Sequence, residues 1–233
     1  MDNGQRNFLD TKRYTILGER CSGTNWLEKL INDNFECQID WTFGWKHWFA
    51  YKGYDDIVIQ NKDVIFLGIV RNPVDYFMSF YTIPHHQPIE RTKNIETFLL
   101  SQFYSVWDTV KSEEIQFDRK FDGTRYKNIF EMRSLKCKYL YDTMPLLSSK
   151  YYFIRYEDLK SDPVDILKKI KQKFNLTVKN KEYFIEKRYV HRDQIFANRV
   201  CRENYKVDND VKNIIKLNLE IEIENRMGYT LFN

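Results

Sequence analysis

The chain passes from strand to loop to helix within the stretch YTILGERCSGTNWL, which runs from Tyr14 to Leu27. Its first four residues are β-prone, and apolar residues recur at helical spacing after Thr24. Gly18 and Gly23 bound the loop at the spacing of a P-loop, where backbone N–H groups and a helix N-terminus hold an anion. The same spacing also suits two glycines that only permit a tight turn.

Two further transitions from strand to helix follow along the chain. The apolar run from Val64 to Val70 has the continuous hydrophobicity of a strand buried on both faces, and Pro73 behind it suits the first turn of a helix. A third strand is expected over residues 151–156, before a helix that opens at Pro163. Further helices are expected over residues 94–112, 127–147 and 208–227. Alternating strands and helices predict an α/β fold with a central, mostly parallel β-sheet flanked by helices.

The length and composition indicate one soluble domain. A chain of 233 residues needs no second core, so we expect a single domain over residues 1–233, with residues 1–13 as a flexible N-terminal segment. The formal net charge is only +4, from 37 basic and 33 acidic residues, so no global field indicates a nucleic-acid partner. Without an apolar stretch or an export signal, the sequence predicts a cytoplasmic protein with no membrane partner.

The cysteines do not indicate a metal or a disulfide framework. The four cysteines lie far apart and form no CxxC pair. In a protein without an export signal we therefore expect reduced thiols and no metal site.

Several motifs resemble those of the sulfotransferases that use 3′-phosphoadenosine-5′-phosphosulfate (PAPS). The stretch Ser22 to Leu27, SGTNWL, is similar to the loop of that family that holds the 5′-phosphosulfate. Arg71 at the end of a strand, followed by Asn-Pro and by Ser79, is similar to its 3′-phosphate motif. A Tyr-Glu-Asp-Leu segment begins at Tyr156, and a Gly-Tyr pair closes the last helix. These matches keep the family's order from residue 14 to residue 229.

The resemblance implies a P-loop sulfotransferase architecture with PAPS as donor and 3′-phosphoadenosine-5′-phosphate (PAP) as product. An arginine fork and a hydroxyl two helical turns later suit one phosphate, although an Arg–Asp75 pair and a buried serine are the plain structural reading. Tyr156 is implied as a contact on the adenine side or is a core tyrosine at a strand end. The full set of implied donor-binding residues is Arg20, Cys21, Ser22, Gly23, Thr24, Asn25, Trp26, Arg71, Ser79 and Tyr156.

Sulfuryl transfer to a hydroxyl needs a base and donors for the leaving phosphate, and it requires no metal. His47 lies between the loop and Arg71, where many members of the family place a catalytic histidine, and it is our candidate base. The adjacent Lys46 is a candidate for stabilising charge on the reacting oxygens. Four aromatic residues around this pair suit exclusion of water, and they equally suit a core or lid with an incidental Lys-His pair.

The sequence departs from the family at Cys21, where the usual loop lysine or arginine would stand. Arg20, one residue earlier, and Lys46 are alternative sources of that charge. We therefore expect both to be catalytic residues together with His47. The late basic segment of the nucleotide site is expected at Arg199 or Arg202.

Two other functions remain open from the sequence. A P-loop phosphotransferase using ATP is disfavoured because no Gly-Lys-Ser/Thr follows at Gly23. An inactive nucleotide-binding module is compatible with the missing cation at Cys21. The acceptor is expected to be a carbohydrate or a small hydroxylated molecule, and the oligomeric state is not indicated.

Overall fold

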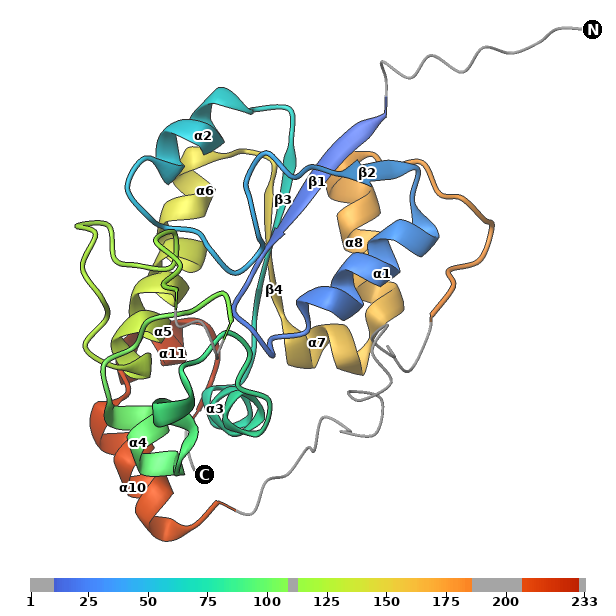
Figure 1. The fold of residues 1–233 in the computed structure, drawn as a ribbon. Coiled ribbons are helices and arrows are strands. Elements are labelled where there is room, and N and C mark those ends of the chain that lie inside the picture. Colours follow the sequence, from blue (N-terminus) through green and yellow to red (C-terminus); the bar gives the residue numbers. More distant parts are fainter. Residues whose placement is uncertain (1–10, 109–112, 186–206, 231–233) are drawn as a thin grey trace, which may run out of the picture.

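The computed structural model describes residues 11–108, 113–185 and 207–230. Their centre is a four-stranded sheet in which every neighbouring pair of strands is parallel, as predicted (Figure 1). The strand order is β2-β1-β3-β4, with β1 at Lys12–Leu17, β2 at Cys37–Ile39, β3 at Ile65–Val70 and β4 at Tyr151–Arg155.

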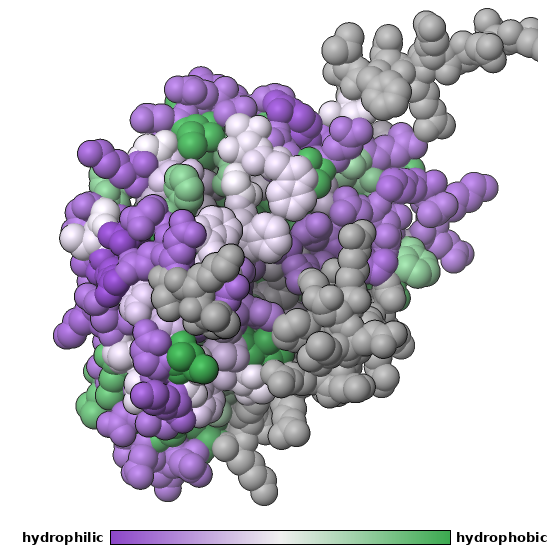
Figure 2. All heavy atoms as spheres, in the orientation of Figure 1, coloured by the Kyte–Doolittle hydropathy of each residue, from purple (hydrophilic) through white to green (hydrophobic). Residues whose placement is uncertain are grey.

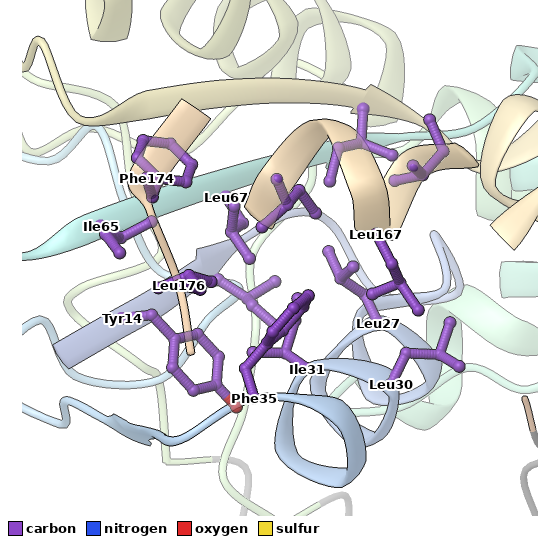
Figure 3. Packing of buried hydrophobic residues seen from close by; sticks show 14 of the residues in the cluster. Tyr14, Leu27, Leu30, Ile31, Phe35, Ile65, Leu67, Leu167, Phe174 and Leu176 are labelled. Atoms are coloured by element: carbon purple, nitrogen blue, oxygen red, sulfur yellow. The ribbon is translucent and has the colours of Figure 1, made fainter. Parts of the chain in front are cut away.

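Helices α1 (Thr24–Asn34) and α8 (Pro163–Phe174) cover one face of the sheet (Figures 1 and 3). Figure 3 shows Leu27 and Ile31 of α1 and Leu167 of α8 packed over the strand residues of this face. The apolar positions of both helices recur at three- and four-residue spacing, so each helix presents one buried stripe to the strands.

The opposite face carries α2 (Tyr54–Gln60) and a long helical segment. This segment consists of α5 (Ile129–Lys138), the short π-helix η3 (Tyr139–Thr143) and α6 (Met144–Leu147), which together confirm the helix expected over residues 127–147. Because both faces are covered, β3 is buried at all six positions, which explains its continuous apolar sequence.

The remaining helices lie beyond the carboxyl edge of the sheet or follow its strands. A third apolar cluster joins α3 to α4, α5 and α10. Asn72 caps α3 by accepting hydrogen bonds from the N–H groups of Val74 and Asp75, and Pro73 opens the helix as predicted. The bounds are α3 Pro73–Thr82, η2 Ile89–Thr92, α4 Ile95–Leu100, α7 Tyr156–Ser161, α10 Asn209–Asn218 and α11 Ile221–Arg226.

Several predicted bounds differ from the structure. The helix expected over residues 94–112 ends at Leu100, because Ser101 is extended and the chain then forms isolated bridges between Phe103 and Tyr126 and between Val106 and Glu114. The helix expected over residues 208–227 breaks into α10 and α11 at the extended, buried Leu219.

The start of β1 and two short elements also differ from the sequence analysis. Strand β1 begins at Lys12 rather than Tyr14, so the last two residues of the segment expected to be flexible lie in the sheet. The strand β2 and the helix α2 were missed, because three and seven residues are too few to show a clear period. Within the described ranges, no helix combines the length and the apolar character that a membrane span requires.

Candidate functional site

The loop between β1 and α1 has the backbone of an anion-binding loop. Cys21 and Gly23 have positive φ angles of 62° and 89°, so the chain turns sharply into α1. Helix α1 has no side-chain cap at its N-terminus and no acidic residue in its first turn. Its first N–H groups and the positive end of its dipole are therefore not used by a side chain of the helix, which suits an anion.

Both loop glycines are required by close contacts. A Cβ at Gly18 would lie 2.6 Å from the carbonyl oxygen of Ile69, because the end of β1 lies tightly against β3. A Cβ at Gly23 would lie 2.4 Å from Cδ2 of Tyr156, so the loop contacts the ring that opens α7. The two glycines thus allow the loop to approach the ends of the two neighbouring strands.

Arg71 reaches the same place from the end of β3. Its Nη1 donates a 3.0 Å hydrogen bond to the carbonyl oxygen of Cys21, and its guanidinium lies 4.9 Å above the centre of the Tyr156 ring. The side chain is only 2% exposed, yet its Nε and Nη2 have no hydrogen-bond partner and it forms no ion pair with any described residue. A buried guanidinium with two unused donors beside such a loop has the chemistry that suits an oxyanion.

The neighbours of Arg71 hold its backbone in place. The carbonyl oxygen of Arg71 accepts a 2.9 Å hydrogen bond from Arg133, which forms a buried ion pair with Glu224. The next N–H, of Asn72, donates to Glu157 at 2.8 Å. Arg133, Glu224 and Glu157 were not identified as site residues from the sequence. Glu157 is part of the Tyr-Glu-Asp-Leu segment and Glu224 opens the segment that ends in the Gly-Tyr pair, but Arg133 carries no local signal.

Ser79 and Tyr156 also lie on elements that meet at this edge. Ser79 is 1% exposed on α3, the helix that begins two residues after Arg71. Trp26, in the first turn of α1, makes an edge contact with Tyr156 at a centroid distance of 6.1 Å. The structure therefore brings Gly23, Trp26, Arg71 and Tyr156 into one group of contacts, and it places Ser79 on the adjoining helix α3.

His47 lies against the start of the loop. Its Nδ1 is 2.6 Å from the carbonyl oxygen of Gly18, and since a carbonyl only accepts, Nδ1 carries the proton and Nε2 keeps its lone pair. Burial lowers the pKa of His47 well below its usual range, and the nearby charge of Arg20 lowers it further. His47 is therefore neutral near pH 7, with Nε2 as the nitrogen that can accept a proton.

Lys46 is held beside the first turns of α1. Its Nζ lies 2.8 Å from a carboxylate oxygen of Glu28 and donates to the side-chain oxygen of Asn25. The loop itself is tied to this segment, because the N–H of Gly18 donates to the carbonyl oxygen of Lys46 at 3.0 Å. Lys46 and Asn25 are thus brought together, and Lys46 is already paired with one carboxylate.

Arg20 points into a buried ionic cluster. Its Nη2 lies 2.9 Å from both Asp118 and the hydroxyl of Ser105. Lys136 completes the cluster at 2.6 Å from Asp118 and 2.6 Å from Glu19, and it donates at 2.7 Å to the carbonyl oxygen of His47. This cluster fixes the loop and His47 together.

The ionic cluster keeps its carboxylate charged. Burial alone would raise the pKa of Asp118, but the positive charges of Lys136 and Arg20 outweigh that effect and hold the pKa below its usual range. Since Arg20 is engaged with Asp118, its contact to a donor molecule remains a prediction. Asp118 and Lys136 were missed, because neither belongs to a recognisable motif.

The remaining site predictions are only partly located. Ser22 and Thr24 are buried in the loop and the first turn of α1, at 1% and 4% exposure. Cys21 is half-buried and forms no disulfide bond with another described cysteine. Arg199 and Arg202 lie outside the described residues. In the described ranges, no group of three or more His, Cys, Asp or Glu side chains is arranged to hold a metal ion.

Comparisons with known proteins assign no family. No family model matches the sequence, and no curated protein matches it by sequence. Among solved structures, the chain is similar to the mouse sulfotransferase SULT7A1 complexed with PAP, with 15% sequence identity and a TM-score of 0.49. That similarity covers 94% of this chain and 85% of the mouse protein. At this level the likeness carries no functional argument, which rests on the side chains of the site.

Proposed function

We propose that this chain is a sulfotransferase that moves a sulfuryl group from PAPS to a hydroxyl of an acceptor. The observation that carries the proposal is Arg71, a guanidinium 2% exposed with two donors left without a partner among the described residues. It lies at hydrogen-bond distance from the backbone of an anion-binding loop. The arginine and the helix N-terminus come from different elements and lie close together. Such a pair suits a nucleotide that carries a phosphate at each end, with one phosphate at the helix N-terminus and the other at the arginine.

The donor would be held by four elements. The N–H groups from Gly23 to Asn25 would bind the 5′-phosphosulfate at the N-terminus of α1. The N–H of Ser22 already donates to the carbonyl oxygen of Glu19 at 3.2 Å, so Ser22 would contribute its hydroxyl. Nε and Nη2 of Arg71 would bind the 3′-phosphate, with the hydroxyl of Ser79 as a further donor. Tyr156, which contacts both Gly23 and the guanidinium of Arg71, would pack against the nucleoside.

His47 would act as the general base. In the reaction the acceptor oxygen forms a bond to sulfur, the bond between sulfur and the bridging 5′-phosphate oxygen breaks, and PAP leaves with that electron pair. Nε2 of His47 takes the proton of the acceptor hydroxyl. The ring is suited to this role because Nδ1–H is fixed on the carbonyl of Gly18 and because the lowered pKa keeps it neutral.

Lys46 is our candidate cation for the transferring group. Its pairing with Glu28 and Asn25 places its charge at the first turns of α1. In the proposed complex it would stabilise the charge that develops on the bridging oxygen. Arg20 would act on the same site indirectly, because its ion pair with Asp118 fixes the loop in place.

The proposal is tested by calorimetric titration of the protein with PAP, with AMP and with ATP plus magnesium. We expect PAP to bind, AMP to bind at least about 100-fold more weakly because the contacts of Arg71 to the 3′-phosphate are lost, and ATP not to bind more tightly than PAP. Arg71→Ala should abolish the preference for PAP over AMP. Arg155→Ala is the matched control, since Arg155 ends the neighbouring strand but donates to the carbonyl of Gly228.

Three results would overturn the assignment. A preference for ATP with magnesium would indicate a phosphotransferase. Tight PAP binding without transfer of labelled sulfate from PAPS to any acceptor in a broad panel would indicate an inactive nucleotide-binding module. Equal binding of PAP and AMP would show that Arg71 does not bind a 3′-phosphate.

A further inference from the structure

Four of the five tryptophans of the chain form one continuous group of ring contacts that begins beside His47. The Trp45 ring lies 6.2 Å from the His47 ring, 6.3 Å from Trp41 and 6.4 Å from Trp48. Trp48 in turn meets the edge of Trp107 at 4.7 Å. We call Trp41, Trp45, Trp48 and Trp107 the tryptophan surface.

Three of these rings are open to solvent. Trp41, Trp45 and Trp107 are 54%, 41% and 50% exposed. Burying an indole removes a large apolar area from water and is favourable, so three exposed indoles side by side are unusual. Figure 2 shows large side chains of intermediate hydropathy gathered in the middle of the face in view, where Figure 1 draws the loop between β2 and α2. A contiguous exposed aromatic surface of this kind marks a binding site rather than a core.

The surface is rigidly joined to the proposed catalytic residues. The N–H of Trp48 donates to the carbonyl oxygen of Trp45 at 2.8 Å, so the four residues from Trp45 to Trp48 form one tight turn. That turn is tied to the loop through Gly18 and to α5 through Lys136. A molecule lying on the indoles is therefore held at a fixed position next to His47.

The shape of the surface selects among acceptors. A phenol or another small apolar acceptor is bound in an enclosed apolar pocket that covers most of its area. Here only Trp48, 8% exposed, is enclosed, and the other three rings are open on one side. Such a surface suits a molecule that stacks one apolar face on an indole and keeps the rest of its surface hydrated. A pyranose ring with equatorial hydroxyls has this property, because its faces carry C–H groups and its hydroxyls lie around the rim.

Polar groups at the surface agree with a neutral sugar. The cation against the Trp45 ring is Lys46, at 5.7 Å, and it is already paired with Glu28. The indole Nε1 of Trp48 has no hydrogen-bond acceptor among the described residues. That nitrogen is buried, so among the described residues the surface offers mainly apolar faces, and the cation beside it already has a carboxylate partner.

We propose that the tryptophan surface binds a neutral oligosaccharide of pyranose units with equatorial hydroxyls and presents one of those hydroxyls to His47. This inference deepens the proposed sulfotransferase function and rests on it for the fate of the hydroxyl. The binding of the sugar itself rests only on the indoles.

The test is calorimetric titration of the full chain, saturated with PAP, with cellohexaose, chitohexaose and 2-naphthol as probes. We expect at least one hexasaccharide to bind, and the double variant Trp41→Ala/Trp107→Ala to bind it at least about tenfold more weakly. PAP affinity should change less than about twofold in that variant, since the ring contacts described for these two indoles are to Trp45 and Trp48 and not to the loop. Phe184→Ala is the matched control, because Phe184 is also 54% exposed but lies beside Asn34 at the other end of α1.

The outcomes separate this inference from the proposed function. Binding of a hexasaccharide by a protein that does not bind PAP would support the sugar surface and remove the sulfotransferase. PAP binding with no affinity for either hexasaccharide at millimolar concentration, or tighter binding of 2-naphthol, would overturn the sugar surface alone. Hexasaccharide binding that the double variant retains in full would also overturn it, and a melting temperature equal to wild type would show that the variant is folded.

Discussion

Replacing Arg71 by methionine should stabilise the protein without ligand and destabilise it, relative to wild type, when PAP is present. In the absence of ligand, Nε and Nη2 are buried without partners, and each unsatisfied donor costs about 1 kcal/mol or more. The variant loses one hydrogen bond to the carbonyl of Cys21, which is worth about 1 kcal/mol. The difference predicts a gain of about 1 kcal/mol in the free energy of unfolding.

When PAP is present, wild type should become more stable than Arg71→Met. At a PAP concentration 100 times its dissociation constant, wild type gains about 2.7 kcal/mol by linkage. Losing the charged contacts of Arg71 weakens binding about 100-fold, so the same concentration gives the variant only about 0.4 kcal/mol. With the starting advantage of about 1 kcal/mol subtracted, wild type should then be more stable by about 1 kcal/mol.

Urea denaturation with and without PAP measures both differences. Arg91→Met is the matched control: Arg91 is also 2% exposed, but its three nitrogens donate to Ser101, Gln87 and the carbonyl of Phe98. Its replacement should cost about 3 kcal/mol or more with or without PAP, because three acceptors lose their donor. If Arg71→Met without ligand is destabilised as strongly as Arg91→Met, Arg71 is a structural residue and the reasoning is refuted.

Two further predictions concern the loop and the base. Gly23→Ala should lower the free energy of unfolding, measured by urea denaturation, by at least about 1 to 2 kcal/mol. Alanine is strained at φ 89°, and its Cβ would lie 2.4 Å from the Tyr156 ring. Unchanged stability would show that the loop can move away from the ring. Since the folded pKa of His47 lies below its unfolded value, the unfolded state binds the extra proton, and stability should fall as the pH drops below about 6.5, by at most about 1.4 kcal/mol per pH unit. His47→Gln should remove that part of the slope between pH 6.5 and 5, and a variant with the wild-type slope would contradict the buried neutral ring.

The sequence was sufficient for features that depend on local patterns. The run from Val64 to Val70 predicts a strand buried on both faces, which the structure has at Ile65–Val70. Pro73 behind Asn72 predicts the helix start, and neither feature depends on distant residues. For the same reason the loop from Gly18 to Gly23 was placed correctly between a strand and a helix.

Features set by contacts distant in the chain were out of reach. The helix expected to run past Leu100 ends there because Ser105 and its neighbours instead pair with a later segment, and the hydroxyl of Ser105 meets Arg20 across 85 residues. Asp118 and Lys136 likewise acquire their roles only when α5 packs against the loop. No period or motif in the sequence records such pairs.

The family's usual loop cation is absent at Cys21, and the other cations around the loop are paired with carboxylates. Arg20 is paired with Asp118, Lys136 lies between Asp118 and Glu19, and Lys46 is paired with Glu28, so three cations face three carboxylates. These groups fix the loop, the turn at His47 and α5 to one another, but together they leave little net charge for a ligand. Of the arginines and lysines described at this edge, Arg71 is the one that contacts the loop without a carboxylate partner. In the proposed complex, the anion is therefore recognised mainly by Arg71 and by the N-terminus of α1, and the conventional loop lysine is not needed for binding.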